Sequence, residues 1–523
     1  MEILSLKEMM AREEEAFRSG LTAAALMEAA GEAMAGRIAE LYPRAARFLV
    51  LVGKGNNGGD GLVVARYLVK VGRQVRVALT APEEELGELP QAMLGRLRGC
   101  GTNLEILPWR EDLDFPGSEG VVIDSLLGVQ ARGALRGNLA GIVAKLNEAR
   151  AAGFFRTVAL DLPSGLAAYE QGAAPENRDA CVVADVTLAV GFAKDVLVRE
   201  ALAGWVGRIE VMPWSRETAS TGARQALLGH ELARLLPRRN ALSYKGDFGR
   251  LAIVAGSAGF GGAPVLCAQA AQAMGAGLLA VVTKPEVVST VAVKAPPEAM
   301  VSGWAGGSEA PAVVRKANAL VIGPGLGADK ETARMLEAAL AVGCPVLIDA
   351  DGLNMLAHHL DLLRTAKGPV VVTPHVGEMA RLIGRKFSMA EREAVARDFV
   401  EQHGVTLVLK GTRTLISAPG KAFFFNTTGN PGLSTGGSGD TLAGIVGALL
   451  AQRLAPLEAA RLGVWLHGHA ADLALAERGC EEGLTPTMLS GHLGHALVSL
   501  RGLAAAKPGL LERAWELTRQ HEK

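Results

Sequence analysis

Residues 47–72 read RFLVLVGKGNNGGDGLVVARYLVKVG, and this stretch indicates how the first half of the chain is built. Its apolar start predicts a buried strand, and Gly53–Gly61 predicts a glycine-rich loop. The apolar pattern after this loop predicts a helix. Backbone amides at such a helix N-terminus attract anions, so we predict an anion site above the loop. The alternative is a glycine turn needed only for packing, although two Asn and one Asp in succession argue against it.

Three glycines of this loop, Gly53, Gly55 and Gly58, satisfy the dinucleotide-binding fingerprint GxGxxG. In enzymes with that fingerprint, an acidic residue after the second strand holds the ribose. The second predicted strand of this chain ends at Thr80 instead. The sequence therefore supports a standard hydride-transfer site only weakly.

Short β-branched runs alternate with Ala- and Leu-rich helical patterns in two series, which is typical of parallel sheets covered on both faces. The polar stretch 214–231 carries no strand pattern, so we predict a linker there between domains 1–213 and 232–523. The predicted fold class is α/β, with two three-layer αβα domains. The predicted strands are 47–53, 74–80, 119–128, 156–165, 185–191 and 207–213, then 250–256, 278–283, 319–327, 345–352, 369–375 and 406–412.

Composition excludes several classes of protein. The 54 Lys and Arg balance 54 Asp and Glu, which disfavours a general polyanion binder. Aromatic residues make up only 4%, which disfavours modules that stack RNA bases. The five cysteines lie far apart without a CxxC, so neither structural zinc nor a disulfide framework is predicted.

The N-terminal sequence MEILSLKEMMAREEEAFRSG is acid-rich and has no continuous apolar core, so we expect no signal or transit peptide and predict a cytoplasmic enzyme. The uncharged stretch Leu251–Thr283 is long enough to span a bilayer, but Gly256, Gly259 and Pro264 interrupt it. We predict a strand, a glycine-rich loop and a buried helix there.

Two aspartates each follow a run of apolar strand residues, Asp124 after VVI and Asp161 after VAL. Both are therefore expected at carboxyl ends of parallel strands, where α/β proteins bind ligands, and in one pocket. With Asn57 and Ser164 they offer oxygen ligands suited to a monovalent or divalent cation. Each aspartate alone could instead cap a helix.

The segments GNNGGDGLVVAR, DSLLG and LDLPSGL, with the opening LKEMMAREEEA and LMEAAGEAMA, resemble the YjeF N-terminal family, which epimerises hydrated NAD(P)H. The resemblance covers about residues 1–213 and implies a Rossmann-like domain with Asp161 as catalytic acid/base. It implies that Asn57, Asp124 and Ser164 hold potassium. The residues it implies for binding the hydrated dinucleotide are Asn56, Asn57, Gly58, Gly59, Asp60, Gly128, Val129, Gln130, Ala131, Arg132, Gly133, Ala134 and Asp161. Gln130 stands where the family usually has glycine.

A second glycine-rich motif, NPGLSTGGSGDTLAG at 430–444, precedes the apolar pattern IVGALLAQRL. Its amides can form an anion hole for a transferring phosphoryl group, and Asp440 can take a proton from a hydroxyl. This motif resembles the arrangement of ribokinase-like enzymes. No GxxxxGK[ST] occurs, which excludes a Walker P-loop. Capping the helix is the structural alternative for Asp440.

Two further segments fit phosphoryl transfer. Lys410–Thr414 follows a predicted strand and offers cations and backbone donors to a nucleotide diphosphate. In TPHVGE, His375 begins an HxxE that stands where ribokinase-like enzymes commonly carry NxxE. This resemblance implies that Glu378 orders magnesium and water, whereas His375 could instead be a capped core histidine. Asp349 and Asp351 could line the pocket or cap the next helix.

The segments SYKGDFGRLAIVAGS, VIGPGLG, IDADGLN, TPHVGEMARL and GGSGDTLAG closely resemble the nucleotide-dependent NAD(P)H-hydrate dehydratase family, over about residues 235–500. The resemblance implies a ribokinase-like domain, with magnesium and with ADP as co-substrate. It implies that Ala263, Gly325, His375 and the catalytic Asp440 contact the hydrated dinucleotide. The residues it implies for ADP are Lys410, Gly411, Thr412, Arg413, Thr414 and Gly439.

Chains that join these two halves in this order resemble bifunctional NAD(P)H-hydrate repair enzymes. That resemblance implies that one half interconverts R- and S-NAD(P)HX and the other dehydrates the S form to NAD(P)H, converting ADP to AMP and phosphate. The implied partners are NADHX, NADPHX and ADP, with no nucleic acid or membrane, in a homo-oligomer. The alternative is a small-alcohol or vitamin-precursor kinase with a non-catalytic N-terminal binding module, against which the HxxE and the start KGDFGRLAIVAGS argue.

Overall fold

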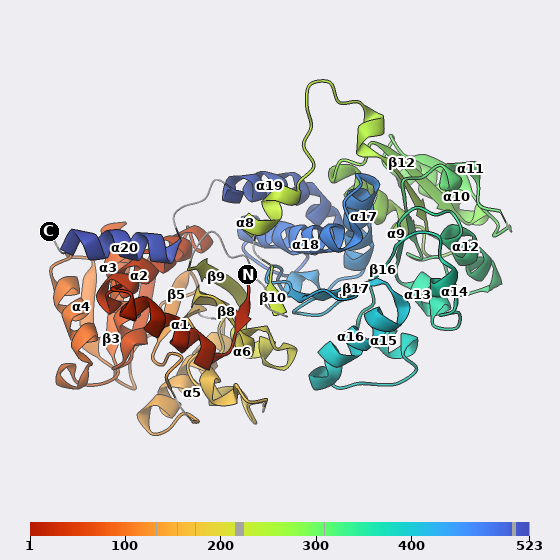
Figure 1. Cartoon of the computed structure of the whole chain (residues 1–523). Helices are drawn as coiled ribbons and strands as arrows, with labels where there is room; N and C mark the ends of the chain where they lie inside the picture. The colour runs from red at the N-terminus through yellow and green to blue at the C-terminus, as the bar shows by residue number, and fades with distance from the viewer. Residues whose placement is uncertain are drawn as a thin grey trace. The chain divides into compact units, whose positions relative to one another are not determined.

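The computed structural model divides into two compact units, one formed by Met1–Gly222 with Lys507–Lys523 and the other by Ala223–Ala506 (Figure 1). We call them unit 1 and unit 2. The structure describes residues 1–131, 133–153, 155–172, 174–214, 224–227, 229–307, 309–504 and 509–521. Among these residues, no helix is both long and apolar enough to cross a membrane.

Unit 1 is built on a seven-stranded parallel sheet with the order β4-β3-β2-β5-β6-β7-β9. The chain order reverses between β2 and β5, the kind of position where α/β sheets bind ligands at their carboxyl edge. All six predicted strands occur. The strands are β2 (Arg47–Val52), β3 (Gln74–Leu79), β4 (Leu104–Pro108), β5 (Gly120–Ser125), β6 (Phe155–Leu160), β7 (Val186–Gly191) and β9 (Arg208–Pro213).

Side chains of β2 alternate between two hydrophobic clusters, as the pleat of a strand requires. Phe48, Val50 and Val52 pack with helices α2 (Ala23–Leu41), α3 (Asn56–Lys70) and α4 (Glu88–Arg98). Leu49 and Leu51 pack with α5 (Asn138–Ala151). Helices therefore cover both faces, which gives the predicted three layers. The short helices α6 (Asp195–Val198) and α7 (Ala203–Val206) complete the unit.

The two ends of the chain both belong to unit 1. Strand β1 (Ile3–Leu4) pairs with β8 (Ala193–Lys194), and helix α1 (Leu6–Arg18) follows it behind a Ser5–Glu8 capping box. Helix α20 (Leu510–His521) packs on α2 (Figure 1). The predicted domain 232–523 is wrong in this respect, because the buried Leu510 of α20 joins the hydrophobic cluster of α2 and α3.

Unit 2 contains a ten-stranded sheet with the order β10-β19-β18-β17-β16-β15-β14-β11-β12-β13. It is parallel except where β18 runs antiparallel to β17 and to β19. The six predicted strands correspond to β11 (Arg250–Val254), β12 (Leu278–Thr283), β14 (Ala319–Ile322), β15 (Val346–Ile348), β16 (Val370–Val372) and β17 (Thr406–Leu409). The others are β10 (Arg224–Ala226), β13 (Met300–Gly303), β18 (Leu415–Ser417) and β19 (Phe423–Phe425).

Strand β10 corrects the prediction of a strandless linker at 214–231. Its three residues pair in parallel with β19 at the sheet edge through backbone hydrogen bonds, which the side-chain pattern RQA does not reveal. Residues 215–223 and 228 of that predicted linker lie outside the described residues.

One face of this sheet packs in a single core against helices that include α9 (Gly262–Ala273), α17 (Ser438–Ala451), α18 (Pro456–Arg478) and α19 (Pro486–Ala504). Helices α12 (Lys330–Leu340) and α16 (Arg392–His403) contact β14 and β17 without joining that core, so they cover the other face. The stretch Leu251–Thr283 comprises β11, a loop, the helix α9 and β12, so the predicted strand, loop and buried helix occur. The remaining helices are α8 (Gly229–Leu232), α10 (Val288–Lys294), α11 (Ala312–Arg315), α13 (Asp351–Leu356), α14 (Leu362–Thr365) and α15 (Val376–Leu382).

Candidate active sites

The glycine loop of unit 1 lies at the predicted helix N-terminus, between β2 and α3. A Cβ on Gly58 would lie 1.9 Å from the carbonyl oxygen of Gly53, and one on Gly61 would lie 2.0 Å from Ser125 Oγ. These glycines are therefore required for packing. A Cβ on Gly55, the N-cap of α3, would meet nothing within 4 Å, so the surface over this helix end is open. These contacts support the packing role, and the anion site above the loop stays a prediction.

Next to this loop, Asn57, Asp124 and Ser164 come together as predicted. Ser164 donates to Asp124 from its hydroxyl at 2.6 Å and from its backbone amide at 2.8 Å, while Asn57 Nδ2 donates to the carbonyl of Leu127 at 2.9 Å. Among the described residues, Asn57 Oδ1 is buried without a hydrogen-bond partner. An orphaned amide oxygen beside a carboxylate and a hydroxyl fits a bound cation. Burial raises the pKa of Asp124 to about 6, although the hydrogen bonds from Ser164 oppose this.

Asp161 belongs to a second group at the same sheet edge. It follows β6 with φ of 65°, an uncommon backbone conformation for a residue other than glycine. Its Oδ1 accepts from the amide of Val190 at 3.0 Å and from the ammonium of Lys194, which is fully buried. Asp161 caps no helix, and neither does Asp124, which excludes the structural alternative for both.

Two more carboxylates face Asp161. Burial, together with the charge of Asp161, raises the pKa of Glu13 to about 7 and the pKa of Asp60 well above its usual range; Lys194 opposes both shifts. Glu13 lies on α1 and Asp60 on α3, and both are half-buried. Sequence analysis predicted Asp60 but missed Glu13 and Lys194.

The predicted substrate loop 128–134 runs along the same edge. A Cβ on Gly128 would lie 3.2 Å from the Cβ of Asn57, so the loop begins beside the cation group. Val129 and Ala131 are half-buried, whereas Gln130, Gly133 and Ala134 are exposed. Arg132 lies outside the described residues.

In unit 2, a buried ion pair connects two strand ends. Lys410 Nζ, after β17, lies 2.8 Å from Asp349 Oδ1, after β15, and 3.8 Å from Glu378 Oε2. Asp349 also accepts from the hydroxyl of Thr373 at 2.8 Å. Burial disfavours the charge on Lys410, but Asp349 and Glu378 outweigh burial and raise its pKa. Asp349 was left outside the predicted site, although it follows a strand as Asp161 does.

Asp440 stands in the first turn of α17 and does not cap it, since the N-cap is Gly437. Burial and the charge of Asp349 raise the pKa of Asp440 to about 6, while Lys410 lowers it. A Cβ on the preceding Gly439 would lie 3.5 Å from Lys410 Nζ. The helix start is therefore next to the Lys410–Asp349 pair, and a half-buried carboxyl with a raised pKa there suits a general base.

His375 and Glu378 form a reciprocal cap at the start of α15. His375 Nδ1 accepts from the amide of Gly377 at 2.9 Å, and Glu378 Oε2 accepts from the amide of His375 at 2.8 Å. Glu378 is buried, whereas the His375 side chain is 54% exposed, so His375 caps the helix but is not a core residue. Its imidazole can contact a ligand at this edge.

The remaining predicted residues of unit 2 lie on neighbouring loops. A Cβ on Gly325 would lie 3.0 Å from the Cβ of Ala263, so these two positions adjoin. In the segment after Lys410, Gly411 and Thr412 are exposed and Thr414 is half-buried. Arg413 is only 4% exposed, so its side chain belongs largely to the interior.

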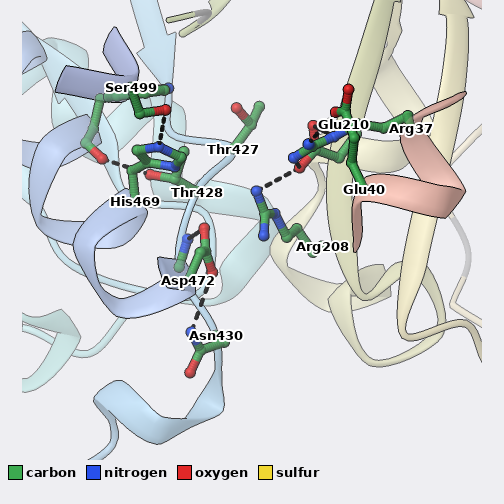
Figure 2. A network of polar contacts seen from close by, with 12 residues as sticks. Arg37, Glu40, Arg208, Glu210, Thr427, Thr428, Asn430, His469, Asp472 and Ser499 are labelled. Carbon is green, nitrogen blue, oxygen red and sulfur yellow. Dashed lines mark hydrogen bonds and ion pairs between the residues drawn. The ribbon is translucent and has the colours of Figure 1, made fainter. Parts of the chain in front are cut away.

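Further polar contacts hold elements within each unit (Figure 2). In unit 2, Asp472 on α18 accepts from Asn430 Nδ2 at 3.1 Å and fixes the start of the motif 430–444, while His469 Nε2 lies 2.9 Å from Ser499 Oγ. In unit 1, Arg37 binds both carboxylate oxygens of Glu210.

Comparison with known proteins matches each unit to a family. Residues 251–494 match the model of NAD(P)H-hydrate dehydratase, and residues 23–196 match that of the YjeF-related protein N-terminus. The bifunctional NAD(P)H-hydrate repair enzyme of Coxiella burnetii is 36% identical to this chain, over 91% of this chain and 96% of its own length. The chain belongs to the family of bifunctional NAD(P)H-hydrate repair enzymes.

A second repair enzyme of this family, from Escherichia coli, is 36% identical over 90% of this chain and 89% of its own length. An ADP/ATP-dependent NAD(P)H-hydrate dehydratase from Bacillus subtilis, co-crystallised with ATP and Mg²⁺, is 29% identical and covers 53% of this chain and 98% of its own, with a TM-score of 0.47. The matched family ranges contain Asp161, Lys194, Asp349 and Asp440. Glu13 precedes them.

Proposed function

We propose that this repair enzyme restores hydrated nicotinamide dinucleotides at two sites, one at the carboxyl edge of the sheet of unit 1 and one at that of unit 2. Unit 1 would interconvert R- and S-NAD(P)HX at Asp161, and unit 2 would dehydrate S-NAD(P)HX at Asp440. The observation that carries the proposal is the half-buried Asp440, which does not cap α17 and lies beside the Lys410–Asp349 pair. A base and a cation at a glycine-rich helix N-terminus serve phosphoryl transfer to a hydroxyl.

Epimerisation needs one group that moves a proton. The hydrate carries its hydroxyl on the carbon beside the ring nitrogen; once protonated, this hydroxyl leaves as water, and the nitrogen lone pair stabilises the planar cation. Water can then return to either face. Asp161 would give the proton and take it back, and the open surface at Gly55 would receive the phosphates of the dinucleotide.

Dehydration needs a poor leaving group to be improved. Asp440 would take the hydroxyl proton while the oxygen attacks the terminal phosphoryl group of ADP, which releases AMP. The carbon–oxygen bond to the phosphate would then break as the ring nitrogen donates its electron pair, and loss of a proton from the adjacent ring carbon would restore the double bond of NAD(P)H. Ala263, Gly325 and His375 would contact the dinucleotide, and Lys410–Thr414 with Gly439 would contact ADP.

We propose potassium for unit 1 and magnesium for unit 2. The orphaned Asn57 Oδ1, Asp124 and Ser164 would hold potassium, which would fix the loop at 126–128 next to the dinucleotide. Glu378, buried beside Lys410, would order magnesium and its water near the ADP phosphates. Magnesium would supply charge neutralisation, while the proton transfers belong to Asp161 and Asp440.

Recovery of the reduced-nicotinamide absorbance tests both sites. Wild type should recover S-hydrate and an S/R mixture completely with ADP, magnesium and potassium. Asp440→Asn should recover neither, and Asp161→Asn should stall once the S form is consumed. Consumption of ADP or ATP with a vitamin-like alcohol, without recovery of either hydrate, would favour the kinase alternative. The homo-oligomer and the cytoplasmic location stay predictions, to be checked by sedimentation and by fractionation.

A further inference from the structure

The carboxylate of Asp161 is held on one side only. Its Oδ1 accepts both from the amide of Val190, at 3.0 Å, and from the ammonium of Lys194, and Lys194 also donates to the carbonyl of Val190 at 2.7 Å. Asp161, Val190 and Lys194 thus form a closed triangle of hydrogen bonds. Among the described residues, no donor is found for Asp161 Oδ2, and the Asp161 side chain keeps 14% of its surface exposed.

Lys194 is a lysine in the interior of unit 1. Its side chain is completely buried, which is rare for lysine unless a partner compensates the charge. The residue is fixed in β8, where it pairs with Leu4 of β1, so the N-terminal strand covers it. The positive φ of Asp161 at 65° indicates that this carboxylate is aimed by its surroundings rather than by the preference of its own backbone.

We infer that Lys194 is a positioning residue for the epimerase: it binds Asp161 Oδ1 and thereby presents Oδ2 to the leaving and returning water of the hydrate. This inference rests on the proposed function of unit 1. With Oδ1 occupied by two donors, proton transfer takes place at Oδ2 alone. The carboxylate therefore meets the hydrate in one orientation.

The surrounding charges agree with this role. The groups that face Lys194 and Asp161 are Glu13 from α1 and Asp60 from α3, both carboxylates whose pKa rises by burial and by the charge of Asp161. Lys194 lowers the pKa of both. Loss of this cation should therefore raise the pKa of Glu13 and of Asp60, so Lys194 acts on the protonation of the groups around Asp161 as well as on its orientation.

The test measures conversion of purified R-hydrate to the R/S mixture by chromatography, without ADP, so that unit 2 takes no part. For Lys194→Met in the full chain we expect kcat to fall about 100-fold while KM changes by less than about threefold, since binding groups remain and one orientation is lost. The acidic limb of the pH–rate profile should move to higher pH. Lys70→Met, which removes an exposed lysine of α3, is the matched control and should behave as wild type.

A second variant distinguishes loss of the ammonium group from loss of the folded structure. Lys194→Ala leaves a cavity that methylammonium or ethylammonium can enter, and these ions should restore epimerisation in proportion to their concentration, whereas ethanol should not. The inference is overturned if Lys194→Met keeps at least half of the wild-type kcat with an unchanged pH profile, or if Lys194→Ala is inactive and neither ion restores it although its unfolding temperature equals that of wild type. A wild-type chain that fails to epimerise R-hydrate would instead refute the proposed function of unit 1.

Discussion

Lys410 Nζ lies 2.8 Å from Asp349 Oδ1, across the carboxyl ends of β17 and β15. Strand β16 lies between these two strands, so the ion pair bridges a full strand of the sheet. The pair also acts on Asp440 with opposite signs, because Asp349 raises the pKa of Asp440 and Lys410 lowers it. The Lys410–Asp349 pair therefore sets the pH at which the proposed base becomes available.

The first prediction concerns the pH dependence of the dehydration reaction. Burial and Asp349 raise the pKa of Asp440 to about 6, and a general base must be ionised to act. The kcat/KM for dehydration of S-hydrate should therefore be constant above pH 6 and fall about tenfold for each pH unit below it. Asp349→Asn should move the midpoint to lower pH, since it removes a like charge and leaves Lys410 free to act on Asp440.

Asp351→Asn is the matched control, because Asp351 raises the pKa of Asp440 less than Asp349 does. Its midpoint should shift in the same direction by a smaller amount. The assignment of Asp440 as the base is wrong if the midpoint in wild type lies near pH 4, or if Asp349→Asn moves it upward.

Sequence analysis predicted the strands that contain a run of β-branched residues and missed strands that are very short or carry polar positions. β4 and β13 are edge strands with exposed positions, and β10 has the polar sequence RQA, so none gives a continuous apolar run. The switch to antiparallel pairing at β18 depends on tertiary context that no local pattern carries. The strands at the centre of both sheets were all predicted.

The site residues also fall into those that a local sequence pattern predicts and those that depend on contacts between distant parts of the chain. Asp124 and Asp161 were predicted because each follows an apolar strand, and Asp349 carries the same signal in IDADG, although it was left outside the site. Lys194 carries no such signal, because its contact with Asp161 joins residues 33 positions apart in the chain. Glu13 reaches the group through α1, which the pairing of β1 with β8 anchors.

A second prediction compares two helical glycines of unit 1. A Cβ on Gly61 would lie 2.0 Å from Ser125 Oγ, whereas a Cβ on Gly36 in α2 would meet nothing within 4 Å. Gly61→Ala should lower the free energy of unfolding by about 1–3 kcal/mol through overpacking. Gly36→Ala should raise it by up to about 1 kcal/mol, because alanine favours the helix. Urea denaturation measures both, and equal effects of the two substitutions would contradict the packing role of Gly61.

A third prediction concerns the cap of α15. His375 Nδ1 accepts from the amides of Gly377 and Glu378. His375→Ala should lower the free energy of unfolding of unit 2 by about 1 kcal/mol, as loss of an N-cap acceptor does. His375→Asn keeps an acceptor and should retain most of this stability, as measured by urea denaturation. If the two variants lose equal stability, the imidazole contributes by packing rather than by capping.

The last prediction tests potassium through stability rather than turnover. Burial raises the pKa of Asp124 to about 6, above the usual value of an unfolded aspartate, so the folded state holds this proton more tightly. The resulting stabilisation is present at low pH and is lost as the pH rises through about 6. Potassium bound by ionised Asp124, Ser164 and the orphaned Asn57 Oδ1 should offset that loss.

Hydrogen exchange of the peptides around β5 measures this effect in the full chain. At pH 8, potassium chloride should slow exchange of these amides relative to choline chloride at equal ionic strength, and the difference should vanish well below pH 6. Asn57→Ala should abolish the potassium effect. Asn147→Ala should weaken unit 1 but keep its response to potassium, because Asn147 is buried and its amide oxygen accepts from Val183. An equal response of wild type and Asn57→Ala would refute the cation site.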